Sequence, residues 1–584
     1  MTSLLRRANG RPQACDPCRF RKVACDHGQP ICSRCKKRRQ TCVYTLTTQP
    51  KPKRHPLPRS RTPASTPTPP CTGYLGFTSH STVFEETRNS LTQVHGSRPA
   101  NGSRPISGPR RGPRVRTEMT APLREMALFV LHNLPPLDQL FTLQRDQCQP
   151  DGWIGEATRR IVQKIRDSFP SPVDDDSLLE DCARTICENT AQPFHEDNIG
   201  TREWMEQLTE APRWESLGLL WTFWDLAQWN NGGGEIVCAC LKHCIELALQ
   251  FTPGNDVILH LCFRRSTMES IVSGDAGLAC WSYHGETVAL MTFLGLHAEP
   301  ETSQYRPTLL SENRRRLFGR VFNIDKVMVS FSGRPPLIGR RYSSTPLPLD
   351  LSDEVLLADD EVITNAVQNL DAQGWNTEGK LLPATLLRAR VMIAFIRDEL
   401  LEIALGRGSQ TTLAHLQDIK ARQIRTMAEF PAGLVYREEE VDDPEINVET
   451  LFSRMLVKLE HLQNLFFVER LMLRLGSDQG NLLVTSFEMV SLTLVIWKRQ
   501  DRFASIRRDF EWLLMAYGAP GGGILCLELL RPTFRGIHPD SPKLSRSSII
   551  QQLSLLIGFL DWGARGRLRR LTGRDCNSIS TLTY

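Results

Sequence analysis

From about residue 118 onward, hydrophobic residues recur at steps of three and four, the spacing of one face of an α-helix. The clearest run contains Leu451, Phe452, Met455, Leu456, Leu459, Leu462, Leu465 and Phe466, and Gly476 follows it as the expected C-terminal cap. Similar patterns predict helices over 216–229, 235–251, 278–297, 308–331, 384–405 and 547–563. Alternating strand patterns are few, so we expect an all-α body of roughly 15 or more helices, with polar loops at 340–360 and 431–447.

Small residues within this body suggest how its helices pack. Gly285 and Ala289 stand four positions apart, and we expect that face to let a neighbouring helix approach closely. The glycine runs 232–234 and 521–523 lack the Lys-Ser/Thr that a phosphate loop requires, so they are interpreted as helix breakers. No nucleophile elbow and no paired metal-ligand motif is found in the body, and we therefore predict that it is not an enzyme.

Residues 45–117 show no pattern that could form a core. They are rich in Pro, Ser, Thr and basic residues, which predicts a disordered linker. Closely spaced prolines from Pro50 to Pro70 exclude a continuous helix and hence a coiled-coil zipper. A homodimer would therefore have to form through the body.

Ahead of the linker, six cysteines form two copies of the unit C-x2-C-x6-C: Cys15, Cys18, Cys25, Cys32, Cys35 and Cys42. Structural zinc takes four tetrahedral ligands and prefers thiolates. Six sulfurs fill two such sites when two sulfurs are shared, so the spacing predicts two Zn²⁺ in a binuclear cluster. The alternative, a small disulfide knot, requires a secreted chain. The start MTSLLRRANGR has no signal-peptide pattern, and we expect no membrane segment.

Charge separates the two parts of the chain. The first 117 residues carry a formal net charge of +19 against +6 for the whole protein, which leaves −13 on the remainder. A basic segment of this size attracts polyphosphate and releases counterions on binding. Double-stranded DNA is therefore the expected partner of the cysteine-rich head.

The head, ACDPCRFRKVACDHGQPICSRCKKRRQTCVY, resembles the fungal Zn2Cys6 binuclear cluster family of transcription regulators. The resemblance implies that Cys15 and Cys32 bridge the zincs, and that the first short helix enters the major groove. By the same resemblance Arg21 and Lys22 read a CGG-type triplet, with Arg19 near the phosphates. Ala24 replaces a residue that is often basic in the family. Lys36, Lys37, Arg38 and Arg39 are expected at the DNA backbone or in a nuclear import signal.

The body stretch 281–300, with Glu312-x-Arg314-Arg315-Arg316 and Ser332-Gly333-Arg334-Pro335, resembles the middle homology region that accompanies such clusters. The resemblance implies a nuclear regulator of RNA polymerase II transcription, tied to a metabolic or secondary-metabolite pathway through co-regulators or a small-molecule effector. We expect a disordered N-terminus (1–14), a DNA-binding domain (15–44), the linker (45–117), an all-helical regulatory domain (118–570) and a tail (571–584).

Three interpretations of body residues complete the predictions. The arginines at 314–316 are expected to pair with nearby acids, and His284 and His297 to be packed side chains rather than metal ligands. Segments 438–443 and 350–361 are candidate acidic activation segments. The alternative function is a zinc module for protein contact, or for targeting a helical ligand-binding or enzymatic body.

Overall fold

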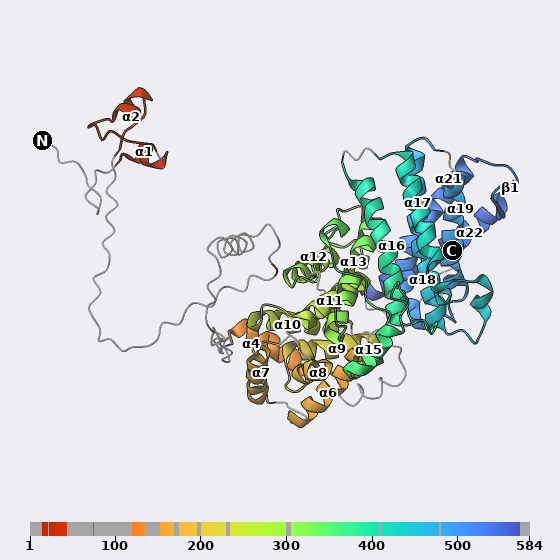
Figure 1. Ribbon diagram of the computed structural model, residues 1–584, viewed down its shortest axis with the longest axis horizontal. Helices are drawn as coiled ribbons and strands as arrows, with labels where there is room; N and C mark the ends of the chain where they lie inside the picture. Colours follow the sequence, from red (N-terminus) through yellow and green to blue (C-terminus); the bar gives the residue numbers. More distant parts are fainter. Residues whose placement is uncertain are drawn as a thin grey trace, which may run out of the picture. The chain divides into compact units, whose positions relative to one another are not determined.

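The computed structural model describes residues 14–21, 23–43, 74, 119–135, 152–168, 175–194, 200–228, 234–299, 305–407, 411–477 and 480–572. The chain divides into two compact units, Met1–Pro69 and Pro70–Tyr584. The first unit contains two short helices, α1 (Asp16–Phe20) and α2 (Ser33–Lys37). They appear in red in Figure 1.

The second unit begins with a group of helices that share one hydrophobic core. These are α4 (Ala121–His132), α6 (Gly152–Ser168), α7 (Asp176–Thr190), α8 (Thr201–Thr209), α9 (Trp214–Gln228), α10 (Gly234–Phe251) and α11 (Asp256–Ser273). Trp153, Trp214 and Trp221 are almost fully buried in this core. Trp224 of α9 is partly buried and packs against the same core.

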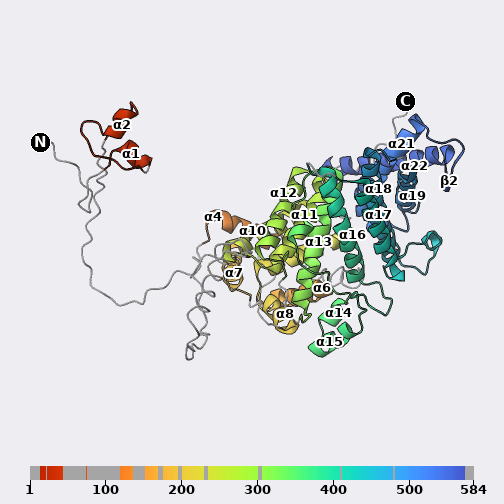
Figure 2. The ribbon, with the colours of Figure 1, turned by 45° about the horizontal axis from the view of Figure 1, so that its top comes forward.

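The middle of the unit is built on two long helices that lie side by side in both views, α13 (Leu309–Ser332) and α16 (Pro383–Leu405) (Figures 1 and 2). Around them lie α12 (Leu278–Phe293), the 3-10 turn η2 (Arg340–Tyr342), α14 (Asp353–Leu356) and α15 (Asp360–Gln368). Gly319 marks the closest approach, because a Cβ there would stand 2.9 Å from Val391 Cγ2 on α16.

The C-terminal part has a core of its own. Its helices are α17 (Leu413–Ala428), η3 (Ala432–Leu434), η4 (Glu438–Asp442), α18 (Val448–Arg474), α19 (Gly480–Lys498), η5 (Ala504–Asp509), α20 (Phe510–Leu513), the π-turn η6 (Leu514–Gly518), α21 (Ala519–Leu530) and α22 (Arg546–Thr572). A two-stranded antiparallel hairpin, β1 (Ile537–His538) and β2 (Ser541–Ser545), precedes α22. Figure 1 shows this part in teal and blue.

The predicted all-α body is confirmed, and each predicted helix is present. The helix expected over 278–297 ends at Phe293 instead, because Gly295 adopts the left-handed conformation with φ +77°. The expected cap at Gly476 is confirmed, with φ +88° and a hydrogen bond from its N–H to the Leu473 carbonyl at 3.1 Å. Sequence periodicity therefore located the helices to within a few residues.

Two interpretations of small residues were wrong. Ala289 is exposed, and Gly285 faces only Leu337, so this face of α12 does not receive a closely packed helix. The run Gly521–Gly523 does not break a helix but lies inside α21. A Cβ on Gly521 would stand 2.8 Å from the Ser486 carbonyl oxygen of α19. Glycine is needed there because two helix backbones approach each other.

Two stretches are long and apolar enough to cross a membrane by length and composition, Asn481–Lys498 and Phe510–Leu530. Of their residues 61% and 50%, respectively, are buried inside the folded body. They are accounted for as core helices of that body.

Most of the predicted linker, 45–117, lies outside the described residues, as do residues 1–13 and 573–584 of the predicted termini. Tyr74 is the part of the linker that the structure describes. Its N–H donates to the Phe293 carbonyl at 2.6 Å, and its ring packs edge-on against His297. Gly295 leaves room for that ring, because a Cβ there would stand 3.1 Å from Tyr74 Cδ2.

Candidate metal centre and nucleic-acid interface

The two short helices of the first unit each begin directly after a cysteine of the motif. Cys15 precedes α1 and Cys32 precedes α2, and the backbone N–H of Cys35 donates to the Cys32 sulfur at 3.4 Å, which caps α2. The Asp16 N–H donates to the Val43 carbonyl at 2.8 Å and joins the two ends of the module. Helices of five residues have little stability alone, so the sulfur cluster must hold them in place.

The sulfur atoms stand at distances that fit tetrahedral zinc. Cys15 Sγ lies 3.7 Å from both Cys32 Sγ and Cys35 Sγ and 3.8 Å from Cys25 Sγ, while Cys18 Sγ lies 3.8 Å from Cys32 Sγ. Zinc–thiolate bonds of about 2.3 Å in a regular tetrahedron place neighbouring sulfurs about 3.8 Å apart. The spacing is therefore that of sulfurs around a shared metal.

Cys15 and Cys32 lie at the centre of the group. Cys15 has three sulfur neighbours from both halves of the motif, and Cys32 has the sulfurs of Cys15 and Cys18. The sixth cysteine, Cys42, is also present, since its sulfur accepts the Cys32 N–H at 3.4 Å. All six predicted ligands thus gather in one place.

Burial sets the thiol chemistry. Cys15, Cys18, Cys32 and Cys35 are buried, and desolvation raises the pKa of Cys15 and raises the pKa of Cys18 to about 11. A hydrogen bond from the Gln40 side chain, 3.4 Å from the sulfur, lowers the pKa of Cys35 to about 7. Buried thiols that are mostly neutral at pH 7 must release protons when zinc binds, which couples metal binding to folding.

Two supporting residues were missed from the sequence. Besides Gln40, Asp26 accepts the Ser33 N–H with both carboxylate oxygens at 3.1 Å. Hydrogen bonds from the side chain and then the backbone of Ser33 lower the pKa of Asp26. Asp26 therefore ties the loop of the first half to the start of α2. Nothing in the local sequence separates it from an ordinary loop carboxylate.

The predicted DNA-contacting residues are placed only in part. Arg21, directly after α1, is exposed, and so are Lys36, Lys37, Arg38 and Arg39 at the end of α2. Lys22 and the side chain of Arg19 lie outside the described residues. The described cations thus leave the metal centre and face solvent, where phosphates could reach them.

Comparison with known families agrees with this geometry. Residues 13–51 match the fungal Zn(2)-Cys(6) binuclear cluster domain, and residues 270–372 match the fungal specific transcription factor domain. The chain carries both of these fungal domains. The zinc-cluster domain binds two zinc ions through its six cysteines, and proteins with these domains are DNA-binding transcription factors rather than enzymes.

Two curated relatives are transcription factors of fungal biosynthetic clusters. The chain is 39% identical over 56 residues to the sorbicillinoid biosynthetic cluster transcription factor sor3 of Hypocrea jecorina, covering 10% of this chain and 8% of the relative. It is 23% identical over 160 residues to the fusarisetin A cluster transcription factor fsa6 of a Fusarium species, covering 27% and 20%. The matches thus span a fifth or less of either relative. No solved structure matches the chain.

Within the fungal specific transcription factor domain, the three consecutive arginines of α13 are structural. Arg314 pairs with Asp256 at 3.0 Å, Arg315 with Glu299 at 2.6 Å, and Arg316 with Asp353. These partners lie on α11, after α12 and on α14. The prediction that the arginines pair with acids is confirmed.

A buried polar network joins α12 and α13 of this domain to α16, which follows the domain in sequence. Lys326 Nζ lies 2.9 Å from Asp325 Oδ2 and 2.6 Å from Asp398 Oδ1, and His284 Nε2 lies 3.2 Å from Asp325 Oδ1. Asp325 also accepts the Leu337 N–H at 3.1 Å, beyond the Ser-Gly-Arg-Pro turn. His284 is therefore a packed, hydrogen-bonded residue, as predicted.

The candidate acidic segments are part of the folded body. Glu438 pairs with Lys543 at 2.6 Å, and Asp442 pairs with Arg499 at 2.6 Å. In the other segment, Asp350 is 1% exposed and accepts hydrogen bonds from Asn376 and Thr385. These carboxylates serve internal contacts.

Proposed function

We propose that this protein is a sequence-specific, zinc-dependent DNA-binding regulator of RNA polymerase II transcription that acts in the nucleus. The observation that carries the proposal is the sulfur group of residues 15–42, with tetrahedral-edge spacing and exposed cations beside it. Both of these relatives are transcription factors of biosynthetic clusters, which supports a secondary-metabolite cluster as the regulated pathway.

In the proposed arrangement Cys15 and Cys32 bridge the two zincs, and Cys18, Cys25, Cys35 and Cys42 each bind one. Zinc supplies the folding energy that holds the two short helices together. Arg21 and Lys22 follow α1 and read a CGG-type triplet in the major groove, where Arg and Lys pair with guanine O6 and N7. Arg19, Lys36, Lys37, Arg38 and Arg39 neutralise phosphates.

In this proposal each segment of the chain has its own role. The DNA-binding domain spans 15–44, the basic segment 45–117 tethers it, and the helical body 118–570 regulates activity through co-regulators or a small-molecule effector. Because the closely spaced prolines from Pro50 to Pro70 exclude a coiled-coil zipper there, a homodimer would form through the body. A zinc module used only for protein contact is less well supported, since the exposed residues described in the head include six Arg or Lys and one acid, Asp26.

The decisive experiment selects bound sequences from a randomised duplex library with the full chain, in parallel with genome-wide occupancy and transcript changes on deletion. Enrichment of CGG triplets is expected. Lys22→Ala should relax triplet preference at a cost of roughly 1–3 kcal/mol, while a phosphate contact such as Lys37→Ala should weaken all sequences equally. No enrichment over random sequence, despite two bound zincs, would reject the DNA-reading role.

A further inference from the structure

The helical body contains a cavity of about 260 Å³ where five helices meet. Its walls come from the start of α6, from α9, α11 and α13, and from the first turns of α16. The lining residues are Ile154, Thr222, Phe223, His260, Phe263, Arg264, Arg320, Asn323, Ile324, Pro383, Leu386, Leu387 and Arg390. The volume lies just below the usual range for sites of drug-sized ligands, so the cavity suits a smaller molecule.

One part of the lining is apolar and another is cationic. Phe223, Phe263, Ile324, Leu386 and Leu387 supply aromatic and aliphatic surface. Three guanidinium groups accompany them, and none of the thirteen described residues that line the cavity is Asp or Glu. An acid-free lining that contains three arginines favours an anionic group on whatever enters.

The three arginines are placed differently. Arg390 pairs with Glu460 at 2.7 Å, so its charge is balanced within the protein. Arg264 and Arg320 are partly exposed at the cavity. Because a guanidinium carries five N–H donors, a contact elsewhere leaves donors for a ligand.

A buried amide faces the same space. Asn323 is 2% exposed, and within the described part of the chain its Oδ1 has no hydrogen-bond partner. An unsatisfied buried polar atom costs free energy, so a ligand group that bonds this amide gains more than it would at the surface. A half-turn about the Cβ–Cγ bond exchanges the amide oxygen and nitrogen, so Asn323 can present either an acceptor or a donor to the ligand.

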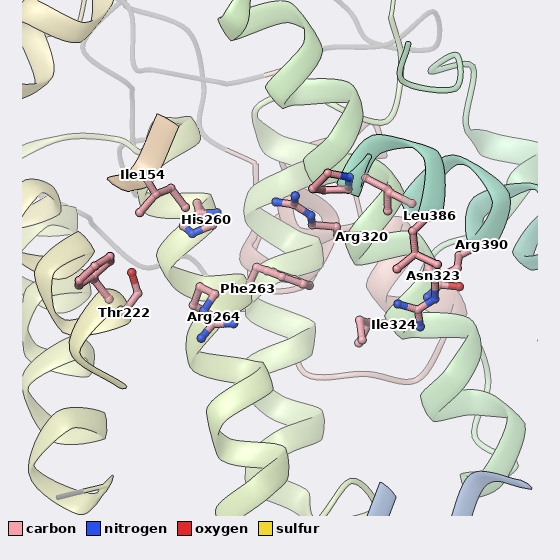
Figure 3. A pocket seen from close by; sticks show the side chains of 13 residues that line it. Ile154, Thr222, His260, Phe263, Arg264, Arg320, Asn323, Ile324, Leu386 and Arg390 are labelled. Atoms are coloured by element: carbon pink, nitrogen blue, oxygen red, sulfur yellow. The ribbon is translucent and has the colours of Figure 1, made fainter. Parts of the chain in front are cut away.

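The geometry brings these groups together. Arg320 and Asn323 lie three positions apart on α13 and therefore share one face of the helix. Figure 3 shows them opposite His260 and Phe263 of α11, with Leu386 of α16 on the same side as Asn323. His260 is 2% exposed and packs edge-on against Trp153, with ring centroids 5.9 Å apart. The cavity thus has a polar side on α13 and an apolar floor.

We propose that this cavity binds a small amphipathic organic acid, with its carboxylate on Arg320 and Asn323 and its apolar part against Phe223, Phe263 and Leu386. The ligand enters past Pro383, which is exposed, and past the partly exposed Arg264. The site lies wholly in the body, and α13 belongs to the segment that matches the fungal specific transcription factor domain. Binding goes beyond DNA reading and does not depend on it.

The test measures binding to the full chain by titration calorimetry. The probes are phenylacetate and octanoate, each beside its uncharged alcohol, 2-phenylethanol and 1-octanol. The two acids show whether the cavity prefers an aromatic or an aliphatic apolar group on the ligand. The proposal is supported if either acid binds more tightly than its alcohol. Arg320→Gln should weaken binding by about tenfold or more, because a hydrogen bond to a charged group is lost.

Matched controls make the result specific. Arg341→Gln removes an exposed arginine beside Glu402, near the opposite end of α16, and should leave affinity unchanged. Leu386→Trp should fill the cavity and abolish binding, and Asn323→Leu should weaken it while keeping side-chain volume. The proposal is overturned if neither acid saturates, if the alcohols bind as tightly as the acids, or if Arg320→Gln and Arg341→Gln behave alike. Zinc content and DNA binding of the same samples report separately on the head.

Discussion

Gln423 on α17 donates a hydrogen bond from its side-chain amide to Nδ1 of His461 on α18, across 3.1 Å. The direction is fixed because the Gln423 carbonyl oxygen accepts from Asn464 at 2.7 Å. Asn464 in turn accepts from Arg397 at 2.9 Å. The chain of bonds therefore requires an unprotonated Nδ1 on His461.

This arrangement predicts acid sensitivity of the body. Burial lowers the pKa of His461 from its ordinary 6.5 to about 3. As the pH falls, His461 is therefore protonated in the unfolded chain before it is protonated in the folded one. Its contribution to the free energy of unfolding is complete above pH 6.5 and is lost as the pH falls toward 3. The expected loss is about 1.4 kcal/mol per pH unit from this residue. Urea unfolding between pH 7 and pH 4 should show a shallower pH dependence for His461→Gln than for the natural chain. Identical slopes would contradict the assignment.

The buried pair Lys326–Asp325 predicts a large effect from removal of one partner. Lys326→Met leaves the carboxylates of Asp325 and Asp398 buried without their cation, which should cost about 3–5 kcal/mol. Lys380→Met, at an exposed pair with Glu378, should leave the urea midpoint nearly unchanged. Equal midpoints for the two variants would show that the network contributes nothing to stability.

Two neighbouring glycines of α21 predict opposite results. Gly521→Ala places a methyl group about 2.8 Å from the Ser486 carbonyl oxygen and should destabilise the protein by roughly 1–3 kcal/mol. No atom lies within 4 Å of a Cβ at Gly523, so Gly523→Ala should stabilise the same helix by about 0.5–1 kcal/mol. Thermal unfolding of both variants checks this; changes of the same sign would refute the packing argument.

The metal centre predicts a stoichiometry. Native mass spectrometry should find two zinc ions per natural chain. Cys18→Ala and Cys32→Ala should both lose zinc and DNA binding, because structural zinc supplies the folding energy of so small a module. Cys526→Ala removes an exposed thiol of the body and should keep both ions. Retention of two zincs by Cys32→Ala would exclude its role as a bridging ligand.

The sequence predicted the elements that depend on local pattern. Helix periodicity located α13, α16 and α18, and the cysteine spacing predicted a metal cluster that the sulfur distances fit. These succeed because 3.6-residue periodicity and ligand spacing are properties of a short stretch of chain.

The contacts that depend on distant partners could not be predicted. Gly285 was expected to admit a neighbouring helix and Gly521 to break one, yet only Gly521 meets another helix backbone, because helix orientation decides which face is covered. The pairing of Lys326 with Asp398 joins positions on separate helices, and the cavity is assembled from five helices. No local sequence pattern predicts such contacts between distant residues.

The arginine run on α13 has a consequence for how related sequences should differ. Its three arginines bind acids that lie 58, 16 and 37 positions away in the sequence, so each arginine has a different ion-pair partner. The pairs join positions 314 and 256, 315 and 299, and 316 and 353. The two positions of each pair should therefore covary among related sequences. A substitution at one arginine should not be accompanied by changes in the other two pairs.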